Sequence, residues 1–223
     1  MIVSPRHRYV FVHIPKTGGT ALALALEPRA AADDILIGDT PKALRRRGRL
    51  KGLTARGRLW KHSTLADIDG VVDLSDPDGW FVFAITRNPW DRVVSLYHWL
   101  RGQGFDHPLV HLARAVDFPA FAAAPLTAAS LRAQPCAAYI TDAAGVERCG
   151  MWLRHERLAQ DVAALGDRLG WRLALPNGVN ASGRGRDWRG YYDAPAVEAV
   201  AQACAADIAR FGYGFDDAGR WGV

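Results

Sequence analysis

The stretch that decides the fold is YVFVHIPKTGGT, residues 9–20. Its first half, residues 9–14, is an apolar run rich in β-branched and aromatic side chains, which is typical of a buried strand. Pro15 ends this run, and the glycine pair 18–19 opens an Ala/Leu-rich segment that predicts a helix to about Leu26. The stretch therefore predicts a strand, a tight loop and a helix, in that order.

A second strand and helix follow the same pattern at residues 80–101. The apolar run WFVFAIT, residues 80–86, stops at Arg87-Asn88-Pro89, and proline at a first helical position predicts a helix over about Trp90–Arg101. The other expected elements are a short helix at 63–69 with Ser63 as its N-cap, helical sequence over 107–133, a strand within 146–153, an amphipathic helix at 156–169 ended by Gly170, and a final helix at 196–210. Strands alternating with helices predict an α/β fold with a mainly parallel central sheet flanked by helices, and no break in composition divides residues 1–223 into more than a single domain.

Composition narrows the class of protein. The 223 residues are 49% hydrophobic and 23% charged, with a formal net charge of +5 that favours anionic partners. Three cysteines, without a CxxC pair or metal-ligand spacing, argue against a disulfide framework and against a zinc site. The first 15 residues lack a cleavage site, and no apolar run reaches the about 20 residues of a membrane span. We expect a cytoplasmic protein.

The loop at residues 15–20 has the composition of an anion site. Glycines let the backbone approach an anion closely, and the N–H groups at the start of the following helix point toward it. Lys16 adds an ammonium group, and Thr17 or Thr20 a hydroxyl. The order differs from that of a Walker A loop, because Lys16 precedes both glycines. The alternative is a tight turn with a surface lysine.

The segment RNPWDRVVSLY, residues 87–97, is a second candidate for phosphate binding. Arg87 follows the second strand, and ligands of open parallel sheets gather at the carboxyl ends of the strands. Arg92, Ser95 and Trp99 share one helical face. An arginine fork and a hydroxyl would grip a phosphate. In the alternative interpretation, Arg92 pairs with a carboxylate and Ser95 is a small contact between helices.

Together the two segments resemble the sulfotransferase superfamily, in particular the branch of carbohydrate sulfotransferases (sulfotransferase family 2 type) and their bacterial relatives. PKTGGT is similar to the loop that holds the 5′-phosphosulfate of PAPS (3′-phosphoadenosine 5′-phosphosulfate), and RNPWDRVVSLY to the segment that holds its 3′-phosphate. Further similarity lies in Lys61-His62-Ser63-Thr64, in residues 153–161 with His155 where phenylalanine is usual, and in residues 180–192 and 207–215. Residues 100–135 and the basic block at 42–61 have no counterpart.

The resemblance implies a P-loop-like three-layer fold and a PAPS-dependent sulfotransferase that uses no metal and releases PAP (adenosine 3′,5′-bisphosphate). It assigns the 5′ side of the donor to Lys16, Thr17, Gly18, Gly19 and Thr20, and the 3′ side to Arg87 and Ser95. Lys16 would stabilise the leaving oxygen, and His62 is the favoured base among seven histidines, with His98 the next candidate. From their own charge and their aromatic neighbours, Arg184 and Arg186 would cover the adenine and the 3′-phosphate, and the alternative is a surface loop that enters a helix.

The basic block, residues 42–61, contains nine lysines or arginines and no acidic residue. It suits an anionic acceptor such as a sulfated or uronate-bearing glycan, although a neutral glycan remains open and solvated charge runs are common. Two alternative functions remain: a P-loop nucleotide kinase or NTPase, and a non-enzymatic polyanion-binding protein. We expect a carbohydrate acceptor and no nucleic acid partner; the sequence leaves the oligomeric state open.

Overall fold

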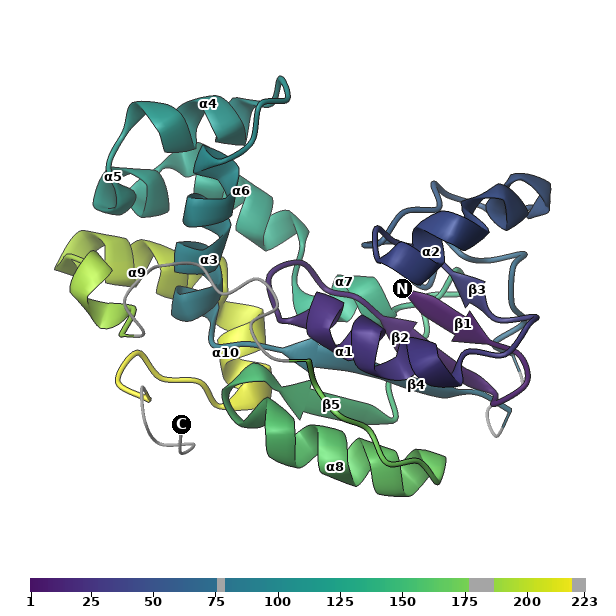
Figure 1. Cartoon of the computed structure of the whole chain (residues 1–223). Helices are drawn as coiled ribbons and strands as arrows, with labels where there is room; N and C mark the ends of the chain where they lie inside the picture. The colour runs from purple at the N-terminus through teal and green to yellow at the C-terminus, as the bar shows by residue number, and fades with distance from the viewer. Residues whose placement is uncertain (76–78, 177–186, 218–223) are drawn as a thin grey trace. The chain divides into compact units, whose positions relative to one another are not determined.

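The structure, a computed structural model, describes residues 1–75, 79–176 and 187–217 (Figure 1). The chain divides into two compact units. The sheet unit comprises Met1–Thr86 and Cys136–Asn180, and the helical unit comprises Arg87–Pro135 and Ala181–Val223. The expectation of one domain over residues 1–223 stays a prediction.

Within the described part of the chain, the sheet unit holds a five-stranded sheet in the order β3-β1-β2-β4-β5. The strands are β1 (Ile2–Ser4), β2 (Tyr9–Val12), β3 (Ile35–Leu36), β4 (Phe81–Thr86) and β5 (Met151–Arg154). β2, β4 and β5 pair in parallel, whereas β1 is antiparallel to both β2 and β3. Four of these five strands therefore run the same way, and the predicted α/β class is confirmed.

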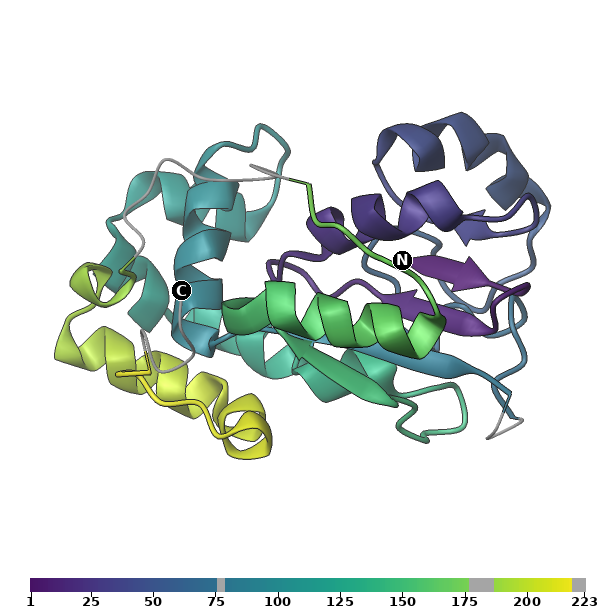
Figure 2. The ribbon, with the colours of Figure 1, turned by 60° about the horizontal axis from the view of Figure 1, so that its bottom comes forward.

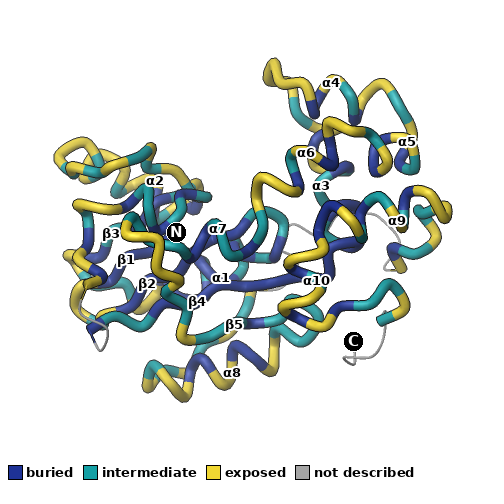
Figure 3. The backbone as a smooth tube through the Cα atoms, turned by 180° about the vertical axis from the view of Figure 1, so that it is seen from behind, coloured by how far each residue is buried: buried dark blue, intermediate teal, exposed yellow. Residues whose placement is uncertain are grey.

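The core of the sheet unit lies against one face of this sheet. Tyr9, Phe11, Phe83 and Ile85 are fully buried, and Figure 3 shows the buried path of β2 and β4. They form one cluster with apolar side chains of α1 (Gly19–Leu26) and α8 (Leu158–Leu169). Because alternate residues of a strand share a face, α1 and α8 cover the same face of the sheet (Figure 2).

The opposite face carries α7 (Cys136–Ile140), whose Cys136 Sγ lies 3.9 Å from the Thr86 Oγ1 of β4. The remaining helices of this unit are short: η1 (Glu27–Arg29), α2 (Pro41–Arg46), η2 (Arg47–Gly52) and η3 (His155–Arg157). α8 ends as predicted at Gly170, which adopts the left-handed conformation with φ 70°. The sequence pattern did not predict β1, β3, α2 or α7.

The predicted strand within 146–153 begins only at Met151. Before it, Asp142 organises a turn: its Oδ1 accepts hydrogen bonds from the backbone N–H groups of Ala144 and Val146, both at 2.9 Å. Thr141 and Glu147 then form an isolated antiparallel bridge. The β-rich sequence after the turn thus closes a local hairpin before the chain enters the sheet.

The predicted helix at 63–69 is wrong, because this segment forms successive turns. Ser63 does not cap a helix: its Oγ accepts from the Trp60 N–H and donates to the Arg58 carbonyl. Thr64 and Asp67 instead exchange hydrogen bonds between side chain and backbone. These local bonds satisfy the backbone without a helical ladder.

In its described residues the helical unit is built from α3 (Pro89–Arg101), α4 (Pro108–Ala115), α5 (Phe118–Ala123), α6 (Pro125–Ala133), η4 (Arg189–Tyr191), α9 (Ala194–Ala203) and α10 (Ala205–Phe211). α3 packs against α4, α5 and α9, and α9 also against α5 and α6. The helical content predicted over 107–133 is confirmed, and prolines at the first turns of α4, α5 and α6 divide it. The predicted final helix breaks at Cys204 into α9 and α10.

Candidate functional site

The loop between β2 and α1, residues 13–18, is called here the Lys16 loop. Lys16 has φ 67° and Gly18 has φ 92°, which are both left-handed values, whereas Thr17 between them does not have a positive φ. Alternation between left- and right-handed conformations is the backbone pattern found in anion-binding nests. The loop is held from within, because the fully buried Thr17 donates its Oγ1 hydrogen to the Ile14 carbonyl at 2.9 Å. The Thr17 hydroxyl therefore serves the loop itself.

The N-terminus of α1 suits an anion. Gly18 is the N-cap, no side chain caps the helix, and its first turn contains no acidic residue. Free N–H groups and the helix dipole favour negative charge at such an end. Gly19 is needed for space, because a Cβ at this position would collide with the imidazole of His13. Gly18 therefore allows the left-handed turn, and Gly19 leaves room for the His13 ring.

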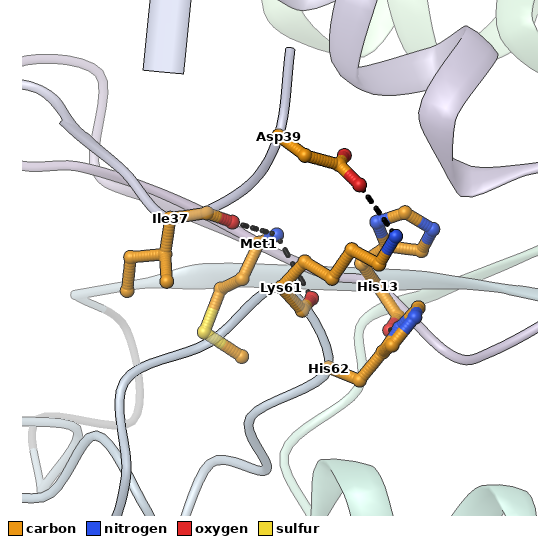
Figure 4. Close-up of polar contacts among 6 residues, drawn as sticks. All are labelled: Met1, His13, Ile37, Asp39, Lys61 and His62. Atoms are coloured by element: carbon orange, nitrogen blue, oxygen red, sulfur yellow. Dashed lines mark hydrogen bonds and ion pairs between the residues drawn. The ribbon is translucent and has the colours of Figure 1, made fainter. Parts of the chain in front are cut away.

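His13, which is buried, and His62, which is half-buried, lie against each other beside this helix end (Figure 4). The Nδ1 of His62 lies 2.8 Å from the His13 carbonyl oxygen, and the two rings meet edge to face with centroids 4.7 Å apart. A carbonyl oxygen only accepts, so the His62 Nδ1 carries the hydrogen and a neutral ring leaves its lone pair on Nε2. The sequence predicted His62, and the structure brings it to the residue that packs on Gly19.

Burial keeps both imidazoles neutral at physiological pH. It lowers the pKa of His62 to about 4, although the hydrogen bond to the His13 carbonyl opposes the shift. Burial also lowers the pKa of His13 well below its usual range, and the neighbouring positive charges of the Met1 amine, Lys61 and Lys16 add to this. His62 therefore stands in the state that can accept a proton.

Lys61, adjacent to His62, is engaged by an acid. Its ammonium lies 2.6 Å from an Asp39 carboxylate oxygen (Figure 4). Partial burial works to raise the pKa of Asp39, but the ammonium of Lys61 brings it below its usual value. The amine of Met1 donates to the carbonyls of Ile37 and Lys61, at 2.9 and 3.1 Å, and burial lowers its pKa to about 5. These contacts fix the segment that carries His62.

Arg87 and Ser95, the predicted residues for the 3′-phosphate, both belong to the helical unit: Arg87 lies between β4 and the N-cap of α3, and Ser95 lies within α3. Arg87 is 8% exposed and holds the Asp91 carboxylate through Nε at 2.8 Å and Nη2 at 2.6 Å. Ser95 is half-buried two turns into the helix. The carboxylate partner of Arg87 was missed from the sequence, although its i, i+4 position on a helix is a readable signal.

Asn88 and Arg92 tie α3 to the rest of the helical unit. The Asn88 side chain accepts from the Trp90 N–H as the helix N-cap and donates to the Gly214 carbonyl. Arg92 lies 3.8 Å from the Asp207 carboxylate of α10. The structure therefore shows the alternative interpretation from the sequence, in which Arg92 pairs with a carboxylate. Arg184 and Arg186 lie outside the described residues.

His98, the second candidate base, lies on α3 in the helical unit. Its ring packs edge to face against Tyr97 and Tyr191, with centroids 5.5 and 5.3 Å apart. This aromatic packing favours a structural role for the His98 ring.

His155 was not assigned a role from the sequence, yet it contacts the Lys16 loop. Its Nδ1 lies 3.2 Å from the Thr17 carbonyl oxygen, and a Cβ at Gly18 would come within 2.8 Å of the same nitrogen. The signal was its place directly after β5, since β2 and β5 are parallel to β4 and their carboxyl ends lie on one edge of the sheet.

The basic segment, residues 42–61, divides into inward and outward cations. Lys42 and Arg46 donate to backbone carbonyls that follow α1, Glu27 and Ala31 respectively. Arg45, Arg47, Lys51 and Arg58 are exposed. Trp60 is 44% exposed, and the Arg58 guanidinium lies over its ring at 5.8 Å. The segment is folded and presents much of its charge to solvent.

Among residues 1–75, 79–176 and 187–217, no three His, Cys, Asp or Glu side chains gather as metal ligands. In the same part of the chain, no helix has the length and apolar character needed to cross a bilayer.

Comparison with known proteins shows that the chain is similar in fold to a solved structure. No known protein family and no curated protein matches the sequence. Among solved structures, the chain is similar to a crystal structure of mouse sulfotransferase SULT7A1 complexed with PAP, with a TM-score of 0.52 and 15% sequence identity over 98% of this chain and 89% of that chain. At this identity the likeness concerns the fold. The predicted P-loop-like α/β architecture is confirmed: this chain has a sulfotransferase fold.

Proposed function

We propose that the protein is a PAPS-dependent sulfotransferase that transfers a sulfuryl group to a hydroxyl group of a carbohydrate. The observation that carries the proposal is the Lys16 loop with its uncapped helix end, packed on a neutral histidine pair, in a fold shared with a sulfotransferase that was crystallised with PAP. PAPS supplies an activated sulfuryl group, with PAP as the leaving group.

The residues of the Lys16 loop and the start of α1 suit the 5′-phosphosulfate. The nest formed by Lys16, Thr17 and Gly18, and the first N–H groups of α1, offer several donors to one anion. The Lys16 ammonium would stabilise charge on the bridging oxygen as the S–O bond to PAP breaks. A sulfuryl group carries less negative charge than a phosphoryl group, so these donors match its charge.

His62 would remove the proton of the acceptor. In the in-line transfer, the acceptor oxygen forms a bond to sulfur while its proton passes to the His62 Nε2, the nitrogen that the hydrogen bond to His13 leaves with the lone pair. The His13 carbonyl would then stabilise the imidazolium through Nδ1–H. The lowered pKa of His62 keeps this nitrogen unprotonated before the transfer.

Arg87 and Ser95 would bind the 3′-phosphate. Asp91 holds the Arg87 guanidinium through two nitrogens, which orients its planar fork before a phosphate arrives. Ser95 would add a hydroxyl donor. Arg184 and Arg186 would contribute positive charge near the adenine and the 3′-phosphate, as their clustering in the sequence suggests.

The basic segment favours an anionic glycan over a neutral one. Arg45, Arg47, Lys51 and Arg58 present positive charge to solvent, and the exposed Trp60 adds a flat ring of the kind on which sugars stack. No acidic side chain within residues 42–61 offsets these charges. Such a surface raises the local concentration of a polyanion and guides it toward the site.

Sulfate transfer from ³⁵S-labelled PAPS tests the proposal, with sulfated and unsulfated polysaccharides, phenols and lipids as acceptors. We expect label in an anionic polysaccharide and equal release of PAP. Lys16→Ala should abolish transfer, and His62→Asn should remove the base while keeping an amide donor near the His13 carbonyl. Label in phenols alone would overturn the carbohydrate assignment, and label in none of the acceptors would overturn the activity.

The exposed arginines also favour a second candidate, a non-enzymatic polyanion-binding protein. This function would need the outward cations of the basic segment but neither Lys16 nor His62. A salt-sensitive interaction with nucleic acid that Lys16→Ala leaves unchanged, together with no release of PAP, would support it.

A further inference from the structure

His155 contacts the Lys16 loop at a point that controls the direction of a backbone N–H group. Its Nδ1 lies 3.2 Å from the Thr17 carbonyl oxygen. A carbonyl oxygen only accepts hydrogen bonds, so the His155 Nδ1 carries a hydrogen and donates it. Nδ1 is protonated in this tautomer of the neutral ring and in the imidazolium, and the contact can therefore form in both charge states.

The Thr17 carbonyl and the Gly18 N–H belong to the same peptide group. A trans peptide is planar, and its C=O and N–H point in opposite directions. A donor that fixes the Thr17 carbonyl toward His155 therefore fixes the Gly18 N–H away from His155. Glycine reaches left- and right-handed conformations with little cost, so without such a donor this peptide could rotate.

Two further contacts lie on either side of this peptide. The Thr17 hydroxyl already holds the Ile14 carbonyl at 2.9 Å, on the other side of Lys16. Beside Gly18, Leu158 Cδ2 would lie 3.6 Å from a Cβ at that position, so the first turn of α8 closes the space around the glycine. Leu158 supplies packing, and His155 supplies the directional bond.

We infer that His155 is a positioning residue of the Lys16 loop: by holding the Thr17 carbonyl, it keeps the Gly18 N–H directed toward a bound anion. The inference rests on the proposed function in one respect, that the loop binds the 5′-phosphosulfate of PAPS. The loop is then organised before the donor binds, and less ordering is needed on binding.

Four variants test the inference. His155→Ala and His155→Phe remove the donor, whereas His155→Asn keeps an amide nitrogen at the position that Nδ1 occupies. Leu158→Ala is the matched control, because it trims the packing on Gly18 and leaves the hydrogen bond. The first measurement is the backbone ¹⁵N order parameters of residues 16–20 in the ligand-free protein, which are independent of any activity.

We expect the order parameters of residues 17 and 18 to fall from the rigid range of about 0.85 toward about 0.6 in His155→Ala and His155→Phe, because the peptide loses the bond that fixes its direction. His155→Asn should restore the wild-type values, and Leu158→Ala should change them less than His155→Ala does. Unchanged order parameters in His155→Ala, or no rescue by His155→Asn, would overturn the inference.

The second measurement is the affinity for PAP and for inorganic pyrophosphate. Both dissociation constants should rise about tenfold in His155→Ala, and KM for PAPS should rise with kcat nearly unchanged, because the effect acts on donor binding. Equal affinities in wild type and His155→Ala, or no binding of either anion to wild type, would overturn the positioning role. If pyrophosphate binds with the expected pattern but no acceptor is sulfated, the inference stands and the proposed function fails.

Discussion

At His62, burial and one hydrogen bond decide the charge and the tautomer of the ring. Burial lowers its pKa to about 4, against an ordinary value of 6.5, and lowers that of His13 as well. Between these two pH values the unfolded chain binds protons that the folded protein does not. The free energy of unfolding therefore decreases as the pH falls from about 6.5 toward 4, and the histidine contribution is fully present only above about 6.5.

The first prediction follows from this decrease in the free energy of unfolding at low pH. Urea unfolding between pH 7.5 and 4.5 should show a loss of stability on acidification, and His62→Asn should reduce its slope by up to about 1.4 kcal/mol per pH unit, the value for one proton. His111→Asn, which removes an exposed imidazole beside Asp106, is the matched control and should not reduce the slope. Equal slopes in wild type and His62→Asn would contradict the burial of a neutral His62.

Gly19 gives a second prediction at the scale of one residue. Alanine favours a helix over glycine by about 1 kcal/mol in a helix interior, but a Cβ at Gly19 would collide with the His13 ring. Overpacking of this kind costs about 1–3 kcal/mol, so we expect Gly19→Ala to be destabilising in denaturant unfolding. Gly104→Ala, where a Cβ meets no atom within 4 Å, should be near neutral. A stabilised Gly19→Ala would show that His13 moves aside freely.

Sequence predicted the candidate site in part. Lys16 and the glycine pair stand together in one short motif, and His62 was singled out by its place after Lys61 and by the family resemblance. His155 was missed because it reaches the Thr17 carbonyl from 138 positions away in the sequence. Such a contact depends on tertiary structure, which a local pattern does not contain. Asp91 lies four residues after Arg87, and this spacing was readable but was overlooked.

At the scale of elements, α2 and η2 combine two uses of positive charge. Arg46 donates through Nη1 to the carbonyls of Ala31 and Asp34, at 2.7 and 3.4 Å. Its neighbours Arg45 and Arg47 are exposed. The inward arginine stabilises the chain beyond α1, and the outward pair is available to an anionic polymer.

The third prediction separates these uses. Arg46→Ala should lower the free energy of unfolding by about 1–3 kcal/mol, the range for a hydrogen bond from a charged donor. The double variant Arg45→Glu/Arg47→Glu should change stability little, yet weaken binding to a sulfated polysaccharide and reduce its salt dependence. Denaturant unfolding and salt-gradient elution from a sulfated matrix measure the two effects. Unchanged elution of the double variant would remove the acceptor surface from the proposal.

Element boundaries followed the sequence where a local signal was strong. Pro89 and Gly170 marked the start of α3 and the end of α8 correctly. β1 and β3 were missed because three and two residues are too few for a periodic pattern. The segment 63–69 was wrongly predicted as a helix because Ser63 has the residue type of an N-cap, whereas in the folded chain its hydroxyl bonds to backbone upstream of it.

At the scale of the whole molecule, the α/β class was predictable because the alternation of apolar strands with amphipathic helices extends along the chain. The comparison with mouse SULT7A1 reaches the same architecture at 15% identity. A fold is compatible with many chemistries, so the ligand must be established by binding. The two alternatives to PAPS, a magnesium nucleotide and a polyanion, make different demands on Lys16 and Arg87.

The fourth prediction is that PAP alone, in buffer with a magnesium chelator, stabilises the protein against heating. A ligand at a hundred times its dissociation constant adds about 2.7 kcal/mol, which for a chain of this size corresponds to a rise in Tm of about 5–10 °C. Lys16→Ala and Arg87→Ala should each reduce the rise, since each removes a cation proposed to meet one end of PAP, and the exposed Arg114→Ala should leave it unchanged. A rise produced by ATP with magnesium but not by PAP would favour a kinase, because such a nucleotide carries its charge on a polyphosphate and needs no 3′-phosphate partner at Arg87.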